Sequence, residues 1–187
     1  MTAKRCSWCE RDALYRAYHD EEWGRPIHDD RRLFELLVLE SFQAGLSWYT
    51  ILAKREGFRA ALDGFDYRLI AAYDDAKVEA LMQDTRIVRN RRKILATIQN
   101  AALFMEIQQE FGSFSEFIWA FVGGSPCVNH PHKLEDVPAS NQTSDAIAAE
   151  LKRRGFKFFG TTVAYAFMQS AGLVNDHSED CAFKYPG

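Results

Sequence analysis

The sequence predicts an all-α protein, and two observations favour that fold class. Apolar residues recur at helical spacing along most of the chain, and residues able to cap helices precede these segments. No two neighbouring segments alternate apolar and polar residues as paired strands would. With 187 residues, 47% of them hydrophobic, the chain can bury a sizeable core. We expect residues 1–187 to form one unit whose helical lobes share a cleft.

The first long helix is expected to begin after Asp29 or Asp30, whose side chains can cap it, and to reach Ala44. Glu40 follows the apolar run 36–39 inside this helix. An unpaired charge is costly to bury in such a segment. A partner that pairs with this carboxylate is therefore expected.

A tight corner is expected to follow, because Gly45 can adopt the left-handed conformation that ends a helix. Ser47 stands where an N-cap belongs, so the next helix should begin at Trp48 and run to about Lys54, ended near Gly57. Leu46 is left at the tip of the corner. It can act there as a hydrophobic staple, packing on the fourth residue of the new helix.

The later helices are expected from the same signals of caps and apolar spacing. They cover about 66–72, 75–82, 91–107, 114–122, 143–155 and 160–172. The long helix is expected to begin after Asn90 as its N-cap. Residues 123–142 hold three prolines and are expected to form a loop, and the residues from 173 onward are expected to form a tail.

Charge is distributed unevenly. The formal net charge of −3 argues against binding nucleic acid through overall attraction, yet residues 86–93 hold five basic residues and no acid. They are Arg86, Arg89, Arg91, Arg92 and Lys93. Such a run can hold DNA phosphates, and it can equally be a solvated face.

The two ends of the chain hold two Cys and two His that suit a zinc ion. Cys6 and His19 have twelve residues between them, and His177 and Cys181 have three. Four protein ligands would fill a tetrahedral site, so one Zn²⁺ would be structural and would join the two ends. Spacing alone leaves open that these residues are unrelated, and that Cys9 replaces a ligand.

Two further expectations concern the surroundings of the chain and of the metal. Asp176 and Asp180 are candidate partners for the ligand imidazoles. No apolar run approaches the roughly 20 residues of a membrane helix, and no apolar region of signal-peptide type follows the first residues. A cytoplasmic protein without a membrane partner is expected.

Several strings resemble the bacterial DNA-3-methyladenine glycosylase I family, and the likeness spans nearly the whole chain. The strings are Cys6-Ser-Trp8, Tyr15-Arg-Ala-Tyr-His-Asp20, Glu22-Trp-Gly24, Leu39-Glu40, Gln43-Ala-Gly-Leu-Ser-Trp48, Arg154-Gly-Phe-Lys-Phe158 and Gly172-Leu-Val-Asn-Asp-His177. The resemblance implies a helix-hairpin-helix DNA glycosylase with one structural zinc and a pocket for a flipped-out alkylated base.

The resemblance also implies roles for particular residues. The base-binding set falls on Tyr15, Tyr18, Glu40 and Trp48, with Trp8 and Trp23 as supporting walls. The zinc ligands fall on Cys6, His19, His177 and Cys181. Leu46, beside Gly45, falls where the family fills the gap in the DNA stack. The hairpin falls on residues 85–92 within a helix-hairpin-helix of about 75–111, where Arg89, Arg91, Arg92 and Lys93 would meet phosphates.

Two departures from the wider superfamily restrict these roles. Most helix-hairpin-helix glycosylases have a glycine-rich hairpin and a catalytic Asp beyond it. Here residues 85–92 contain no Gly, and no Asp stands between Asp84 and Asp136. The chain therefore resembles the subgroup that works without that Asp, and Glu40 is the candidate catalytic group. Phe42 also stands where polar residues are common.

The function expected is hydrolysis of the N-glycosidic bond of 3-methyladenine in alkylated double-stranded DNA, by a monomer. No Lys is evident near the pocket motif, so strand cleavage through a Schiff base is not expected. One alternative is a binding module that recognises alkylated DNA or free base without catalysis. Another is a zinc-clasped structural domain in which Trp48 and Tyr18 are core aromatics.

Overall fold

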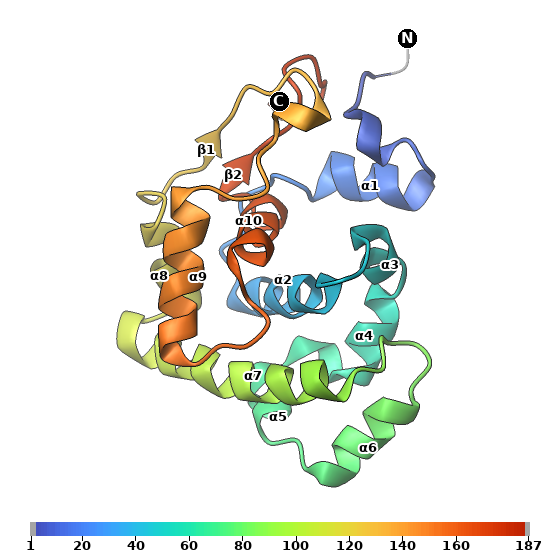
Figure 1. The fold of residues 1–187 in the computed structure, drawn as a ribbon, viewed down its shortest axis with the longest axis vertical. Coiled ribbons are helices and arrows are strands. Elements are labelled where there is room, and N and C mark those ends of the chain that lie inside the picture. Colours follow the sequence, from blue (N-terminus) through green and yellow to red (C-terminus); the bar gives the residue numbers. More distant parts are fainter. Residues whose placement is uncertain (1–2, 186–187) are drawn as a thin grey trace.

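Helix α2, Asp30–Gln43, lies at the centre of the fold, and most of its side chains are buried. The computed structural model describes residues 3–185, and Figure 1 shows α2 surrounded by other helices. Those in contact with it are α3 (Trp48–Ala53), α7 (Arg91–Phe111), α8 (Phe114–Ala120) and α10 (Thr161–Ser170). The apolar residues around Glu40 therefore form the core.

The remaining elements are short. The expectation of an all-α protein is confirmed to the extent that the structure is mostly helical. The other α-helices are α1 (Ala13–Glu21), α4 (Arg55–Ala61), α5 (Tyr67–Ala71), α6 (Asp75–Gln83) and α9 (Gln142–Arg154). Single 3₁₀ turns occur at η1 (Ser7–Cys9), η2 (Asp63–Phe65) and η3 (Leu134–Asp136). One apolar cluster runs through most helices, and a smaller one joins the two ends of the chain.

The helix starts predicted from capping residues are confirmed at three places. The Asp29 carboxylate accepts the backbone N–H of Arg32 at 2.9 Å and opens α2. The Ser47 hydroxyl accepts the backbone N–H of the third residue after it at 3.2 Å and caps the start of α3. The Asn90 amide oxygen likewise accepts the backbone N–H of the third residue after it at 3.1 Å and caps the start of α7. Because each bond spans three residues, local sequence is enough to predict it.

The helix that begins after Ser47 ends at Ala53, as expected, but Gly57 lies inside the next helix, α4, and does not end a helix. A Cβ at this position would stand 2.5 Å from the backbone oxygen of Arg86. Glycine is therefore required here for close packing of α4 against the connection between α6 and α7. The Lys54 ammonium donates to the carbonyl oxygen of Thr85 in the same connection, at 2.9 Å.

The C-terminal part also differs from the expectation of a loop and a tail. Strand β1 (Cys127–Val128) pairs in parallel with β2 (Val174–Asn175), in a register that joins Cys127 to Val174. Residues 173–177 are buried. The pair was not predicted because each strand has only two residues, too few to show an alternating pattern.

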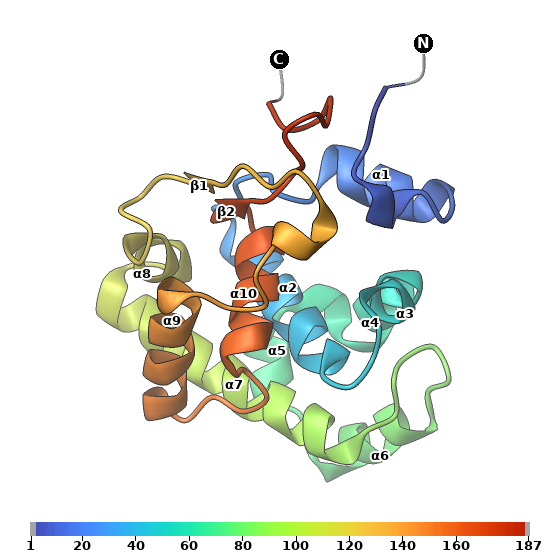
Figure 2. The same cartoon turned by 45° about the horizontal axis from the view of Figure 1, so that its top comes forward.

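Segments from both ends of the chain lie side by side. Figure 2 shows that they occupy the same side of the molecule, and the Ala182 N–H donates to the Lys4 carbonyl at 2.9 Å. In both ribbon views α1 and α3 lie to the right of α2 and α10. None of the helices within residues 3–185 is long and apolar enough to cross a membrane.

Candidate active site and metal-binding group

A cleft of about 740 Å³ lies between α1, α2, α3 and α10, and the sequence-predicted aromatic residues meet in it. They are Trp8, Tyr15, Tyr18, Trp23 and Trp48, and Glu40 lines the same cleft. The structure thus brings together every residue that was expected to bind the base. They come from η1, α1, the turn that follows α1, α2 and α3, so the fold and not local sequence assembles them.

The aromatic side chains hold one another in place. Tyr15 and Tyr18 are three residues apart on α1 and so share one helix face. The Trp8 ring packs edge to face against Tyr15 and against Trp23, with 4.9 Å between centroids in each case. Tyr18 packs on Trp48 at 5.4 Å. Such pairs are favourable because ring edges and ring faces carry opposite partial charges.

Glu40 is a buried carboxyl group in this apolar setting. Its side chain is 2% exposed, and burial raises its pKa to about 8. The neighbouring Ser170 hydroxyl, which donates its proton to the Phe167 carbonyl, only partly offsets the effect on the pKa. The partner expected for this carboxylate is not found within residues 3–185, because Oε2 has no hydrogen bond there. At neutral pH the protonated form therefore predominates in the free protein.

The indole Nε1 of Trp48 is also buried without a hydrogen-bond partner in the described part of the chain. It and Glu40 Oε2 are the two such side-chain atoms among residues 3–185, and both residues line the cleft. Buried polar atoms are normally paired, since leaving one unpaired costs about 1 to 3 kcal/mol. A donor and an acceptor left free in one cleft indicate a polar ligand.

The corner between α2 and α3 has the expected form. Gly45 has φ +83°, and no atom lies within 4 Å of the position where its Cβ would be. Leu46 is 41% exposed, which leaves its side chain available to a partner. Its N–H donates to the Gln43 carbonyl at 2.6 Å, so the turn is closed by the backbone.

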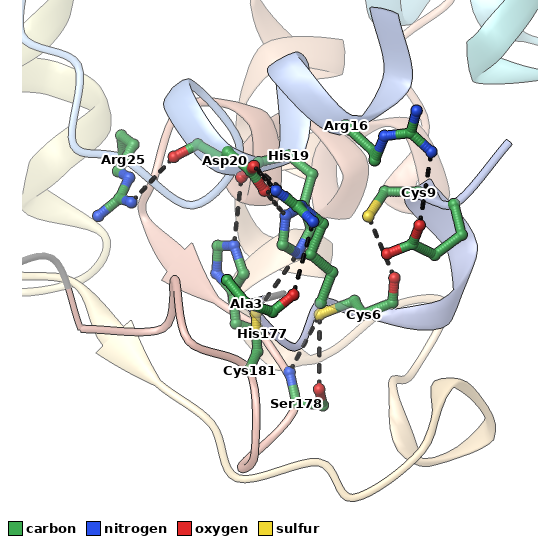
Figure 3. A network of polar contacts seen from close by, with 12 residues as sticks. Ala3, Cys6, Cys9, Arg16, His19, Asp20, Arg25, His177, Ser178 and Cys181 are labelled. Atoms are coloured by element: carbon green, nitrogen blue, oxygen red, sulfur yellow. Dashed lines mark hydrogen bonds and ion pairs between the residues drawn. The ribbon is translucent and has the colours of Figure 1, made fainter. Parts of the chain in front are cut away.

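Three of the four predicted metal ligands form one group. The ligand atoms of Cys6, His19 and Cys181 lie within 4.8 Å of one another, and all three residues are buried (Figure 3). The His19 Nδ1 lies 2.7 Å from an Asp20 carboxylate oxygen, and the Arg5 guanidinium binds the same carboxylate at 2.7 and 2.9 Å. The Asp20 contact leaves His19 Nε2 directed toward the thiols, as a metal ligand would be.

His177 lies next to this group without belonging to it. Its ring centroid is 4.7 Å from that of His19, but its Nε2 lies 3.4 Å from the His19 carbonyl oxygen. Its Nδ1 lies 2.9 Å from the Asn175 amide oxygen. Cys9 also lies outside the group: its thiol donates to the Cys6 carbonyl, and burial raises its pKa to about 12.

The carboxylates expected to support the imidazoles are bound elsewhere, which corrects that expectation. Asp180 pairs with Lys4, and Asp176 accepts hydrogen bonds from Tyr165 and Gln169. Asp20 contacts the His19 ring instead. Because Asp20 directly follows its histidine, its supporting role was available to the sequence reading and was missed.

The sequence reading also missed one wall of the cleft. The loop residues 131–135 and 137–139 line it, as do Lys4 and Gln43. From α10 come Thr162, Tyr165, Ala166 and Gln169, at the spacing of a single helix face. This face of α10 lies opposite the predicted apolar face. The position of the apolar face in the sequence was therefore the signal that could have revealed it.

One residue of the basic run 86–93, Lys93, differs from the expectation. Arg89, Arg91 and Arg92 are exposed, Arg91 pairs with Glu79, and Arg92 lies over the Phe158 ring at 5.7 Å. Lys93, by contrast, is 7% exposed, and its ammonium donates to the carbonyl oxygens of residues 42 and 44 at 2.8 and 2.6 Å. It closes the end of α2 and so is not available to a phosphate.

Comparison with known proteins identifies the family. The family model for methyladenine glycosylases matches residues 8–185. The chain belongs to the methyladenine glycosylase family. The resemblance noted in the sequence is thereby confirmed.

Individual members of the family are similar over almost the entire chain. DNA-3-methyladenine glycosylase 1 from Escherichia coli (strain K12) is 48% identical over 184 residues, which cover 98% of each chain. A crystal structure of 3-methyladenine DNA glycosylase I has 50% identity and a TM-score of 0.93, covering 96% of this chain and 98% of that one. The Staphylococcus aureus enzyme, in a structure concerning recognition of 3-methyladenine, has 36% identity and a TM-score of 0.94, covering 98% of this chain and 97% of that one.

Proposed function

We propose that this methyladenine glycosylase is a monofunctional DNA glycosylase that hydrolyses the N-glycosidic bond of 3-methyladenine. It releases the free base from alkylated double-stranded DNA and leaves an abasic site. The observation that supports this proposal most is the unpaired Oε2 of Glu40 inside a cleft of aromatic rings. A cationic purine with an exocyclic amine offers both the positive charge and the N–H groups that such a carboxyl group lacks.

Binding of the cationic base changes the charge of Glu40. Protonation predominates in the empty cleft because burial disfavours the carboxylate. A positive charge nearby favours the carboxylate, which then accepts from the exocyclic amine. Trp48 and Tyr18 stack on the base, and cation-π contacts contribute about 0.5 to 2 kcal/mol each, depending on desolvation. Neutral adenine gains neither the ion pair nor the full cation-π contact, so lesion choice follows from charge.

The bond is broken with little help to the leaving group. Alkylation at N3 makes adenine positively charged, so its departure with the bonding electrons yields a neutral base. The sugar acquires oxocarbenium character, and water adds to C1′. The Glu40 carboxylate stabilises the positive charge of the bound base and the developing charge of the sugar through space.

Three exposed arginines and one leucine are proposed to bind DNA. Arg89, Arg91 and Arg92 stand at the connection between α6 and α7 and would contact phosphates, which position the duplex without reading sequence. Leu46, beside Gly45, would fill the space vacated by the flipped nucleotide, as apolar side chains do when they enter a base stack. The α6–α7 pair would thus serve as the helix-hairpin-helix.

One structural Zn²⁺ is proposed at the Cys and His group. The donor set fits, since Cys6, His19 and Cys181 converge while Asp20 holds the far side of the imidazole. His177 would be the fourth ligand after a change in its ring orientation. The ion would supply cross-linking of the two chain ends and no reaction chemistry, because four protein ligands leave no site for water.

Base release is the direct test of the proposed function. The protein is incubated with methylated duplex DNA, free bases are separated by chromatography, and zinc is quantified in the same preparation. We expect 3-methyladenine to be released and the DNA strand to stay intact until alkali cleaves the abasic site. Tight binding of methylated DNA without base release would favour the non-catalytic binding module.

A further inference from the structure

Gln169 has an amide group facing the cleft that the proposed chemistry does not use. It lies on α10 and lines the cleft. Its Nε2 donates to Asp176 Oδ2 at 2.8 Å, and its backbone carbonyl accepts the Gly24 N–H at 2.9 Å. Both the backbone and the side chain of Gln169 are therefore fixed by contacts outside its own helix.

The Asp176 carboxylate determines which way this amide faces. Asp176 is 3% exposed and also accepts from the Tyr165 hydroxyl at 2.8 Å and the Asn129 amide at 2.7 Å. All three partners are neutral donors, and no Lys or Arg in the described chain forms an ion pair with Asp176. The nitrogen side of the Gln169 amide must face the carboxylate, so its oxygen faces away from it.

Gln169 and Glu40 line the same cleft. The next residue, Ser170, lies close enough to Glu40 to influence its pKa, whereas the aromatic rings come from α1, α3 and the N-terminal turn. No described residue donates a hydrogen bond to Gln169 Oε1. A donor carried by a bound molecule or a water is therefore its remaining partner.

We propose that Gln169 is a positioning residue that accepts a hydrogen bond from the water attacking C1′, an inference that rests on the proposed function. The water oxygen forms a bond to C1′, and the C1′–N9 bond breaks. Its electron pair neutralises the alkylated base, and the proton lost by water passes to solvent. The bond from Nε2 to the carboxylate polarises the amide and makes Oε1 a better acceptor.

A neutral amide suits this role better than a base would. The leaving group already carries a positive charge, so the reaction demands correct placement of a weak nucleophile more than proton removal. Correct placement alone can contribute a large part of an enzymatic rate. Asp176 meanwhile places a negative charge near the cleft, which favours the cationic sugar.

The test is Gln169→Met, which keeps the length of the side chain and removes both polar atoms. Gln99→Met is the matched control, because the Gln99 amide also donates a hydrogen bond, in this case to a backbone carbonyl, but Gln99 lies on α7 outside the cleft. Single-turnover release of 3-methyladenine is measured with enzyme in excess, and binding of free 3-methyladenine is measured by tryptophan fluorescence. We expect the rate constant of Gln169→Met to fall by about 100-fold while free-base affinity stays within about twofold.

The outcomes separate this inference from the proposed function. An unchanged rate constant in Gln169→Met, with active wild type, would overturn the water-positioning role alone. Parallel losses of rate and free-base affinity would also overturn it, since they assign Gln169 to base binding. Wild type that releases no base would refute the proposed function itself. If Gln169→Met does not fold, Gln169→Leu replaces it, because it also removes the acceptor oxygen and should lower the rate in the same way.

Discussion

Glu40 is neutral in the empty cleft and charged in the occupied one, and that difference is the basis of selectivity. Burial raises its pKa to about 8, so the apolar cleft does not have to hold a bare charge while it waits for substrate. A cationic base reverses the preference. The residue therefore pairs with 3-methyladenine and offers no equivalent ion pair to an undamaged base.

The raised pKa of Glu40 has a consequence for stability. Its folded-state pKa lies above the ordinary value of 4.5, so the folded protein holds an extra proton between pH 4.5 and about 8. Glu40 therefore lowers the free energy of unfolding increasingly as pH rises through this window. We expect Glu40→Gln to be as stable as wild type near pH 4 and more stable by roughly 3 to 5 kcal/mol at pH 8. Urea unfolding at several pH values measures this, and a difference that does not vary with pH would contradict it.

Leu46 can be tested against its local alternative. As a residue that enters the base stack, it should matter for DNA and little for the fold, because its side chain is 41% exposed. We expect Leu46→Ala to weaken duplex binding several-fold while Tm falls no more than in Leu69→Ala, a control on α5 with 54% exposure. A larger fall in Tm with unchanged duplex affinity would assign Leu46 to the hydrophobic staple.

At the scale of elements, the helix starts could be predicted and their contacts could not. Asp29, Ser47 and Asn90 act within one turn of their own helices. Lys93 illustrates the opposite case, since its acceptors are about fifty positions away in the sequence and it was therefore grouped with its exposed neighbours. Gly57 was taken for a helix end for the same reason, because the Arg86 carbonyl that requires it is remote in sequence.

The connection between α6 and α7 should hold phosphates through its arginines and not through Lys93. We expect Arg92→Gln to reduce the slope of log affinity against log salt by about 0.9, the value for one phosphate. Lys93→Met should leave that slope unchanged and lower the free energy of unfolding by about 1 to 3 kcal/mol, because two carbonyls at the end of α2, one of them buried, lose their donor. Duplex titrations at several salt concentrations test both, with Lys152→Gln on α9 as control. Equal slopes for Arg92→Gln and wild type would exclude phosphate anchoring there.

At the scale of the whole molecule, the two ends of the chain form one wall of the cleft. Cys6 and Cys181 stand in the same small cluster as Tyr18 and Trp23, so the metal-binding group lies directly behind the aromatic rings. Joining the ends therefore also supports the base-binding surface. Removal of a metal should therefore affect base binding in the cleft as well as the stability of the fold.

Metal removal provides the corresponding prediction. We expect a strong chelator to lower Tm and to weaken binding of free 3-methyladenine, with both restored by added Zn²⁺, because metal binding contributes to folding. Cys181→Ser should behave like the chelated protein, whereas Cys127→Ser, at an exposed cysteine outside the group, should not. Wild type with the same Tm before and after chelation would count against the structural ion.

The sequence predicted the aromatic wall of the cleft for a physical reason. Aromatic residues and a carboxylate in an apolar helix are visible without a structure, and family resemblance joined them into a site. The wall from α10 and residues 131–139 consists of polar residues at ordinary helical and loop positions. Their role depends on the long-range packing of α10 against α2, which spacing along the chain does not reveal.

The central claim is that Glu40 acquires its charge when the cationic base binds and that this charge contributes to excision. Single-turnover release of 3-methyladenine from methylated duplex by wild type and Glu40→Gln tests it most directly. Glutamine keeps the shape of the side chain and cannot acquire the charge, so we expect its rate constant to fall by about 100-fold. A Glu40→Gln protein that excises 3-methyladenine at the wild-type rate would contradict the claim.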